Sequence, residues 1–92
     1  MIAHNESFLI YESATGDLFI HFPNSDGSWG KAVNMAEKLE SAESQDRFPR
    51  LSNDGKYLFF VRHELVNGRW TNGDFYWVYA KIIEELKPVE LK

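Results

Sequence analysis

Two stretches of this 92-residue chain resemble each other, and this internal repeat restricts the possible folds more than any other feature. Residues 2–13 align without a gap on residues 51–62, and residues 16–20 align on residues 73–77. The second copy differs mainly by a longer loop between its two segments. A period of about fifty residues indicates a supersecondary unit that buries its apolar surface against neighbouring units.

Each copy contains a predicted β-hairpin. In the second copy an Asn-Asp-Gly cluster precedes the densest apolar run, residues 56–61, and glycine there can adopt the left-handed conformation that a hairpin turn requires. Polar turns separate six predicted strands, which cover residues 7–12, 17–22, 31–35, 48–52, 57–62 and 74–80. Pro88 ends a last apolar segment, residues 81–87, which we predict to be a short helix.

Two polar segments lie between these elements. Residues 34–46 are acidic, and Asn34 and Glu37 are spaced as a loose capping box, so the segment is either a brief helix or a solvated connection. Residues 63–73 form the longest insert and contain two Asn-Gly pairs. We expect this insert to be an exposed loop.

The predicted strands are apolar on both of their alternating faces. In residues 57–61, for example, Tyr57, Phe59 and Val61 alternate with Leu58 and Phe60. A sheet with water on one side alternates apolar with polar residues, so these sheets require cover on both sides. Two sheets packed together cover one face each. We therefore expect identical chains to assemble, with each chain donating an edge or a sheet face to the next.

The second copy resembles the TolB-like family of β-propeller repeats. Blades of that family carry a Pro-x-Leu-Ser-x-Asp-Gly-Lys-x-Leu-x-Phe segment, which forms strand, turn and strand, followed by a Gly-Asp-aromatic strand. The matching residues here are Pro49, Leu51, Ser52, Asp54, Gly55, Lys56, Leu58, Phe60, Gly73, Asp74, Phe75 and Tyr76. The first copy departs from the motif, because His-Asn-Glu-Ser at residues 4–7 stands where the Asn-Asp-Gly-Lys turn is expected.

The resemblance implies an all-β fold of antiparallel, four-stranded propeller-blade sheets, about two blades in one partial β-propeller domain. Residues 1–36 form an incomplete first blade in this interpretation, and residues 46–92 form the second blade with the short helix. The innermost strand of the first blade is missing. This leaves an open, apolar sheet edge, the predicted oligomer edge, at Phe8, Leu9, Ile10 and Tyr11.

The resemblance also implies a non-enzymatic binding and scaffolding module that self-assembles through open sheet edges and apolar sheet faces. A trimer is favoured, because three chains of two blades close a six-bladed ring. An alternative is that the chain forms the non-catalytic C-terminal blades of a propeller-containing hydrolase. A third is a fragment with no function beyond folding.

Composition excludes several other classes. Ten basic and fourteen acidic residues give a net charge of −4 without a basic stripe, so we expect neither nucleic acid nor an anionic membrane as partner. The absence of cysteine excludes disulfides and thiolate sites, and the three histidines share no metal-ligand spacing, so we predict no metal and no cofactor. Residues 1–6 lack the features of a secretion signal; related propellers are often periplasmic or secreted, and the compartment stays open.

Candidate binding residues follow from blade geometry, in which the loops between strands two and three and the crossovers between blades share one rim. This rim and the adjacent channel gather the predicted site residues Asp46, Arg47, Arg62, His63, Glu64, Arg69 and Trp70. Arg and Trp are common anchors of recognition surfaces, which favours a protein, peptide or carbohydrate partner. The alternative is that Arg69 and Trp70 form a hairpin tip that packs on a neighbouring subunit.

Overall fold

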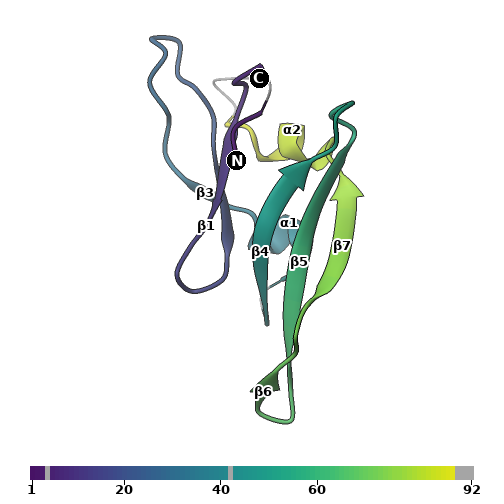
Figure 1. Ribbon diagram of the computed structural model, residues 1–92. Coiled ribbons are helices and arrows are strands. Elements are labelled where there is room, and N and C mark those ends of the chain that lie inside the picture. Colours follow the sequence, from purple (N-terminus) through teal and green to yellow (C-terminus); the bar gives the residue numbers. More distant parts are fainter. Residues whose placement is uncertain (4, 42, 89–92) are drawn as a thin grey trace.

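The strands of the chain form two antiparallel sheets that pack against each other (Figure 1). The computed structural model describes residues 1–3, 5–41 and 43–88. The N-terminal sheet contains β1 (Leu9–Glu12), β2 (Leu18–His21) and β3 (Val33–Asn34), in that order. The C-terminal sheet contains β4 (Ser44–Leu51), β5 (Tyr57–Val66), β6 (Arg69–Trp70) and β7 (Asp74–Tyr79). The prediction of an antiparallel, mostly β chain is confirmed.

The central strand of the C-terminal sheet is β5, which pairs with β4 on one side and with β7 and β6 on the other. The predicted turn at residues 52–55 joins β4 to β5. Ser52 Oγ donates a hydrogen bond to Asp54 Oδ1 (2.6 Å), and the same oxygen accepts one from the backbone N–H of Lys56 (3.0 Å). These hydrogen bonds hold the pKa of Asp54 below its ordinary value and close the turn.

The insert at residues 63–73 is a hairpin, which corrects the expectation of a loop and agrees with the alternative of a hairpin tip at Arg69 and Trp70. β5 continues to Val66, and β6 returns after a two-residue turn in which Asn67 and Gly68 both have positive φ (51° and 77°). An Asn-Gly pair is the preferred sequence for such a turn, because both residues tolerate the left-handed region. The Asn-Gly pair and the apolar residues beside it, Leu65, Val66 and Trp70, were visible in the sequence.

Two short helices and a bulged strand lie at the remaining predicted segments. The segment after β3 takes the helical alternative as α1 (Ala36–Leu39), where Asn34 Oδ1 accepts a hydrogen bond from the N–H of Ala36 (2.7 Å). The strand that follows begins earlier than predicted and passes through a bulge at Phe48 and Pro49, because proline cannot donate to a regular ladder. The predicted C-terminal helix is present as α2 (Ile82–Leu86).

The first three residues lie along the outer edge of β1. Ile2 forms a bridge with Leu9, the N–H of Ala3 donates to the carbonyl of Phe8 (3.0 Å), and the N–H of Ile10 donates to the carbonyl of Met1 (2.8 Å). The predicted open edge at Phe8, Leu9, Ile10 and Tyr11 is therefore covered over its first part. The reason is that the edge groups of β1 find backbone partners within their own chain.

The apolar core lies between the two sheets. It combines Ile10 of β1 and Leu18 and Ile20 of β2 with Leu58 and Phe60 of β5, all of which are buried. Phe8, Phe22 and Met35 add to it from the connections, Leu39 adds to it from α1, and Ile83 adds to it from α2. Each sheet thus buries one of its two apolar faces, as the sequence predicts.

The internal repeat is also a repeat of structure. All four residue pairs between β1 and β2 align on residue pairs between β5 and β7, so that Ile10 opposite Ile20 corresponds to Phe59 opposite Trp77. The Ile2–Leu9 bridge likewise aligns on the Leu51–Leu58 pair of β4 and β5.

Aromatic packing repeats as well. Tyr11 and Phe19 stack with ring centroids 5.8 Å apart and planes at 17°, and their counterparts Phe60 and Tyr76 stack at 6.1 Å and 15°. The copies differ at the other edge: β2 is flanked by β3, whereas β7 pairs only with β5 among the strands of the described ranges. Residue 4 of the departing motif, which is His4, and residues 89–92 of the predicted second blade lie outside those ranges.

A substitution at Gly73 tests how closely the chain before β7 packs against β5. Its φ is 98°, and an added Cβ lies 2.7 Å from Val61 Cγ1 and 2.8 Å from His63 Cε1. Gly73→Ala is expected to reduce the free energy of unfolding by about 2–4 kcal/mol, from backbone strain and overpacking together. Gly68→Ala is the matched control, because Gly68 also has positive φ but nothing within 4 Å of an added Cβ. Urea denaturation measures both, and equal losses contradict the described packing.

Candidate functional site

The outer face of the C-terminal sheet carries a group of large apolar side chains, which we call the aromatic face. It consists of Tyr57, Phe59, Phe75, Trp77 and Tyr79. Tyr57 lies opposite Tyr79 and Phe59 lies opposite Trp77 across β5 and β7. Side chains alternate between the faces of a strand, so these residues point away from the core that contains Leu58 and Phe60.

This face is open to solvent. The exposed fraction is 86% for Phe75, 52% for Trp77, 53% for Tyr79 and 40% for Phe59. Monomeric soluble proteins rarely expose a contiguous patch of several large apolar side chains, and such patches mark interaction surfaces. The exposed sheet face is therefore the strongest candidate for a functional site.

Four of the five rings of the aromatic face pack against one another, those of Tyr57, Phe59, Trp77 and Tyr79. Trp77 packs edge to face against Tyr57 and against Tyr79, with centroid distances of 5.3 Å in both cases. At the rim, Lys81 Nζ lies 5.5 Å from the centre of the Tyr79 ring, in position for a cation–π contact. Because the rings are already packed, they lose little conformational entropy when a partner covers them.

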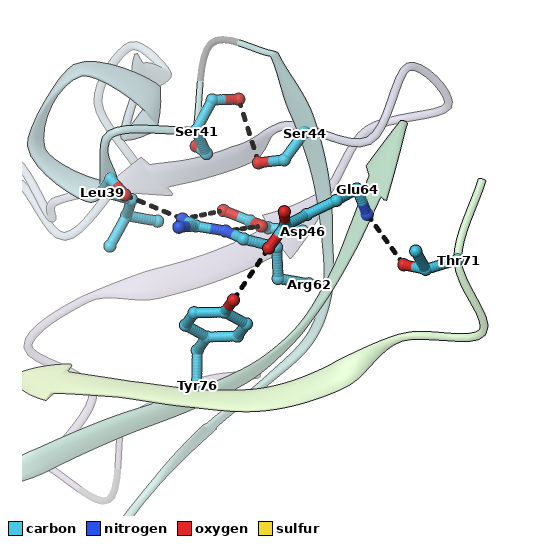
Figure 2. Close-up of polar contacts among 8 residues, drawn as sticks. All are labelled: Leu39, Ser41, Ser44, Asp46, Arg62, Glu64, Thr71 and Tyr76. Atoms are coloured by element: carbon cyan, nitrogen blue, oxygen red, sulfur yellow. Dashed lines mark hydrogen bonds and ion pairs between the residues drawn. The ribbon is translucent and has the colours of Figure 1, made fainter. Parts of the chain in front are cut away.

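The predicted residues Asp46 and Arg62 meet inside the molecule instead of at a channel (Figure 2). Arg62 Nε donates to Asp46 Oδ1 (2.8 Å), and Arg62 Nη2 donates to Asp46 Oδ2 (3.1 Å). Nη2 also donates to the carbonyl oxygen of Leu39 at the end of α1 (2.7 Å). The Asp46 side chain is fully buried. The pair therefore joins β4, β5 and α1, and its hydrogen bonds raise the pKa of Arg62.

Aromatic rings and a second carboxylate surround this pair. The Arg62 guanidinium lies 4.9 Å from the Tyr76 ring centre and 5.2 Å from that of Phe60. The Tyr76 hydroxyl donates to Glu64 Oε1 (2.8 Å), and this hydrogen bond raises the pKa of Tyr76. Three predicted site residues, Asp46, Arg62 and Glu64, are thus brought together, and the first two have structural partners.

The other predicted site residues lie apart from this cluster. Arg47 lies 3.8 Å from the Glu12 carboxylate, and His63 Nδ1 is 2.9 Å from the carbonyl oxygen of Thr71. Arg69 and Trp70 are exposed in the hairpin tip, where Trp70 pairs with Leu65. The predicted rim is therefore divided between the core side of the sheet and an extended hairpin. The predicted edge residues divide as well, since Phe8 and Ile10 are buried and Tyr11 is 40% exposed.

The aromatic face was not among the predicted site residues, although its signal was present. The alternation of Phe75, Trp77 and Tyr79 with Tyr76 and Val78 shows a strand that is apolar on both faces. The sequence does not say which of two apolar faces is left uncovered, because that depends on how the sheets pack.

A pocket of about 450 Å³ adjoins the aromatic face at the end nearest α2. Its lining includes Phe8, Phe22, Tyr57, Tyr79 and Ile83, together with the stems of neighbouring lysines. The pocket extends the apolar surface of the face toward the core and shares Tyr57 and Tyr79 with it.

Neither a metal centre nor a membrane segment is found in the described part of the chain. No three or more His, Asp or Glu side chains of residues 1–3, 5–41 and 43–88 are grouped so that they could hold a metal ion. No helix within these ranges is long and apolar enough to cross a membrane. The chain matches no protein-family model, and searches of curated proteins and solved structures gave no significant match. The TolB-like resemblance stays a prediction.

Asp46→Ala tests the structural role of the buried pair. It leaves the Arg62 side chain, of which 13% is exposed, without its carboxylate partner, so the free energy of unfolding is expected to fall by about 3–5 kcal/mol. Glu85→Ala is the control. It removes the exposed Lys38–Glu85 pair and is expected to cost less than about 1 kcal/mol. Thermal and urea denaturation report both losses, and a similar small loss for the two variants contradicts the assignment.

The pKa of Tyr76 is expected to lie above the ordinary tyrosine value because of its hydrogen bond to Glu64. A raised pKa means that folding favours the neutral phenol. The stabilisation is complete below the ordinary tyrosine pKa and is lost as the pH rises through the raised value of the folded state. Glu64→Gln is expected to bring the Tyr76 pKa down toward its ordinary value. NMR of the labelled tyrosine ring carbons measures it, with Glu84→Gln as control, and an unchanged Tyr76 pKa contradicts the contact.

Proposed function

We propose that the chain is a non-enzymatic binding and scaffolding module that self-assembles through the aromatic face of its C-terminal sheet. The observation that carries this proposal is the group of mutually packed, exposed rings on one side of β5 and β7. Binding by a sheet face needs no catalytic group, and the buried ion pair of Asp46 and Arg62 serves to hold the sheet in shape.

The size of the aromatic face supports association. The exposed parts of its rings amount to an area on the order of 500 Å², which corresponds to roughly 12 kcal/mol of gross apolar burial from one side. Association costs about 4–15 kcal/mol in lost translational and rotational freedom. The two magnitudes are comparable, so the proposed association is expected to depend on protein concentration.

In this proposal the two sheets act as blades of a propeller-like assembly. Each sheet has one apolar face in the core, and the second faces meet between subunits. A trimer that closes a ring of six sheets is the favoured assembly. The hairpin tip with Arg69 and Trp70 then projects from the ring and is available for a protein, peptide or carbohydrate partner.

Light scattering on a sizing column at two protein concentrations tests the proposal. The wild-type chain is expected to form a discrete oligomer that dissociates on dilution, and Phe75→Glu is expected to be monomeric, because a carboxylate is costly to bury in an apolar contact. Val66→Glu is the matched control, since Val66 is similarly apolar and 51% exposed but lies on the other face of β5. A wild-type chain that is monomeric at every concentration contradicts the proposed function.

A further inference from the structure

The internal repeat relates the exposed faces of the molecule to its buried ones. Phe8, Ile10, Leu18 and Ile20 form the buried face of the N-terminal sheet, and they align on Tyr57, Phe59, Phe75 and Trp77 of the aromatic face. The same side of the repeat unit is thus buried in the first copy and open to solvent in the second.

The opposite side of the unit shows the reverse relation. Leu58, Phe60, Tyr76 and Val78 form the core side of the C-terminal sheet. They align on Leu9, Tyr11, Phe19 and His21, which we call the outer N-terminal face. This face also has packed rings, since Tyr11 stacks on Phe19 (5.8 Å) and on His21 (5.4 Å), and Tyr11 is 40% exposed.

The contact between the two sheets of one chain therefore joins two unlike sides of the repeat unit. One further example of each side lies outside this contact. These are the aromatic face and the outer N-terminal face, where Tyr11 is exposed and the other three residues are half-buried. We propose that the aromatic face of one copy binds the outer N-terminal face of a second copy, in a head-to-tail contact that repeats the sheet packing within the chain. This inference rests on the proposed function and adds to it the partner surface and the symmetry of the contact.

The symmetry distinguishes this contact from a simple dimer. A head-to-tail contact joins two different surfaces, so each subunit keeps one free surface until the chain of contacts closes into a ring. A two-fold dimer joins the aromatic faces of two copies and leaves the outer N-terminal faces free. The internal repeat favours the head-to-tail contact. The aromatic face aligns on the buried face of the N-terminal sheet, and that buried face packs on the opposite side of the repeat unit in the C-terminal sheet.

Mixing two blocked variants tests the head-to-tail contact. Phe75→Glu blocks the aromatic face and Tyr11→Glu blocks the outer N-terminal face, and each is expected to weaken self-association by more than about tenfold. An equimolar mixture is expected to form a one-to-one heterodimer and nothing larger, because only one intact pair of surfaces is present. Light scattering measures the mass, after circular dichroism has shown that both variants are folded.

The possible outcomes separate this inference from the proposed function. A monomeric wild-type chain overturns both. A Tyr11→Glu variant that dimerises by itself supports the proposed function and overturns the head-to-tail contact. If the wild-type chain associates but the mixture stays monomeric, the head-to-tail contact is likewise overturned and the proposed function is retained.

A second measurement does not depend on Tyr11→Glu folding. The chain has no cysteine, so Tyr11→Cys and Phe75→Cys introduce single thiols. Mixed under oxidising conditions, they are expected to give the 11–75 crosslink in preference to the 75–75 crosslink, and the reverse preference overturns the inference.

Discussion

A β-sheet that is apolar on both faces needs cover on both sides, and the rest of this structure depends on how far the chain meets that requirement. The core supplies one cover, because the N-terminal sheet packs against the C-terminal sheet (Figure 1). Leu58 and Phe60 of β5 are buried in this contact. The second cover is not provided by the described residues, which leaves Phe75 and Trp77 in solvent. The proposed assembly follows from this uncovered face, since exposed aromatic side chains are typical of the apolar core of a protein interface.

The buried pair of Asp46 and Arg62 has a different role. It marks the end of the apolar core on the inner side of β5. Beyond Phe60 the core side of β5 becomes polar, and Arg62 turns to Asp46 and to the carbonyl of Leu39 (Figure 2). A buried arginine that lacks such partners destabilises a fold strongly, so these contacts hold α1 against β4 and β5. The pair joins β4, β5 and α1 by directional hydrogen bonds, whereas the apolar contacts of the core are not directional.

Local patterns predicted most of the elements. The hairpins, the short helix at residues 82–86 and the two-sided apolar strands follow from turn residues and alternation, which act over a few positions. Three features depended on distant contacts. Ile2 covers the edge of β1, Asp46 turns inward to Arg62, and the face that stays exposed is chosen by sheet packing. Turn residues and alternation thus located the sheets, whereas the inward direction of Asp46 was not visible, because polar character does not reveal direction.

The emission of Trp77 tests the central claim most directly, because this residue lies in the middle of the aromatic face. In a chain with Trp29→Phe and Trp70→Phe, Trp77 is the single tryptophan that remains. The account predicts blue-shifted emission that is protected from a soluble quencher at high protein concentration, and red-shifted, quenched emission after dilution. Emission that stays red-shifted and equally open to the quencher at all concentrations would show that the face remains in water, which contradicts the account.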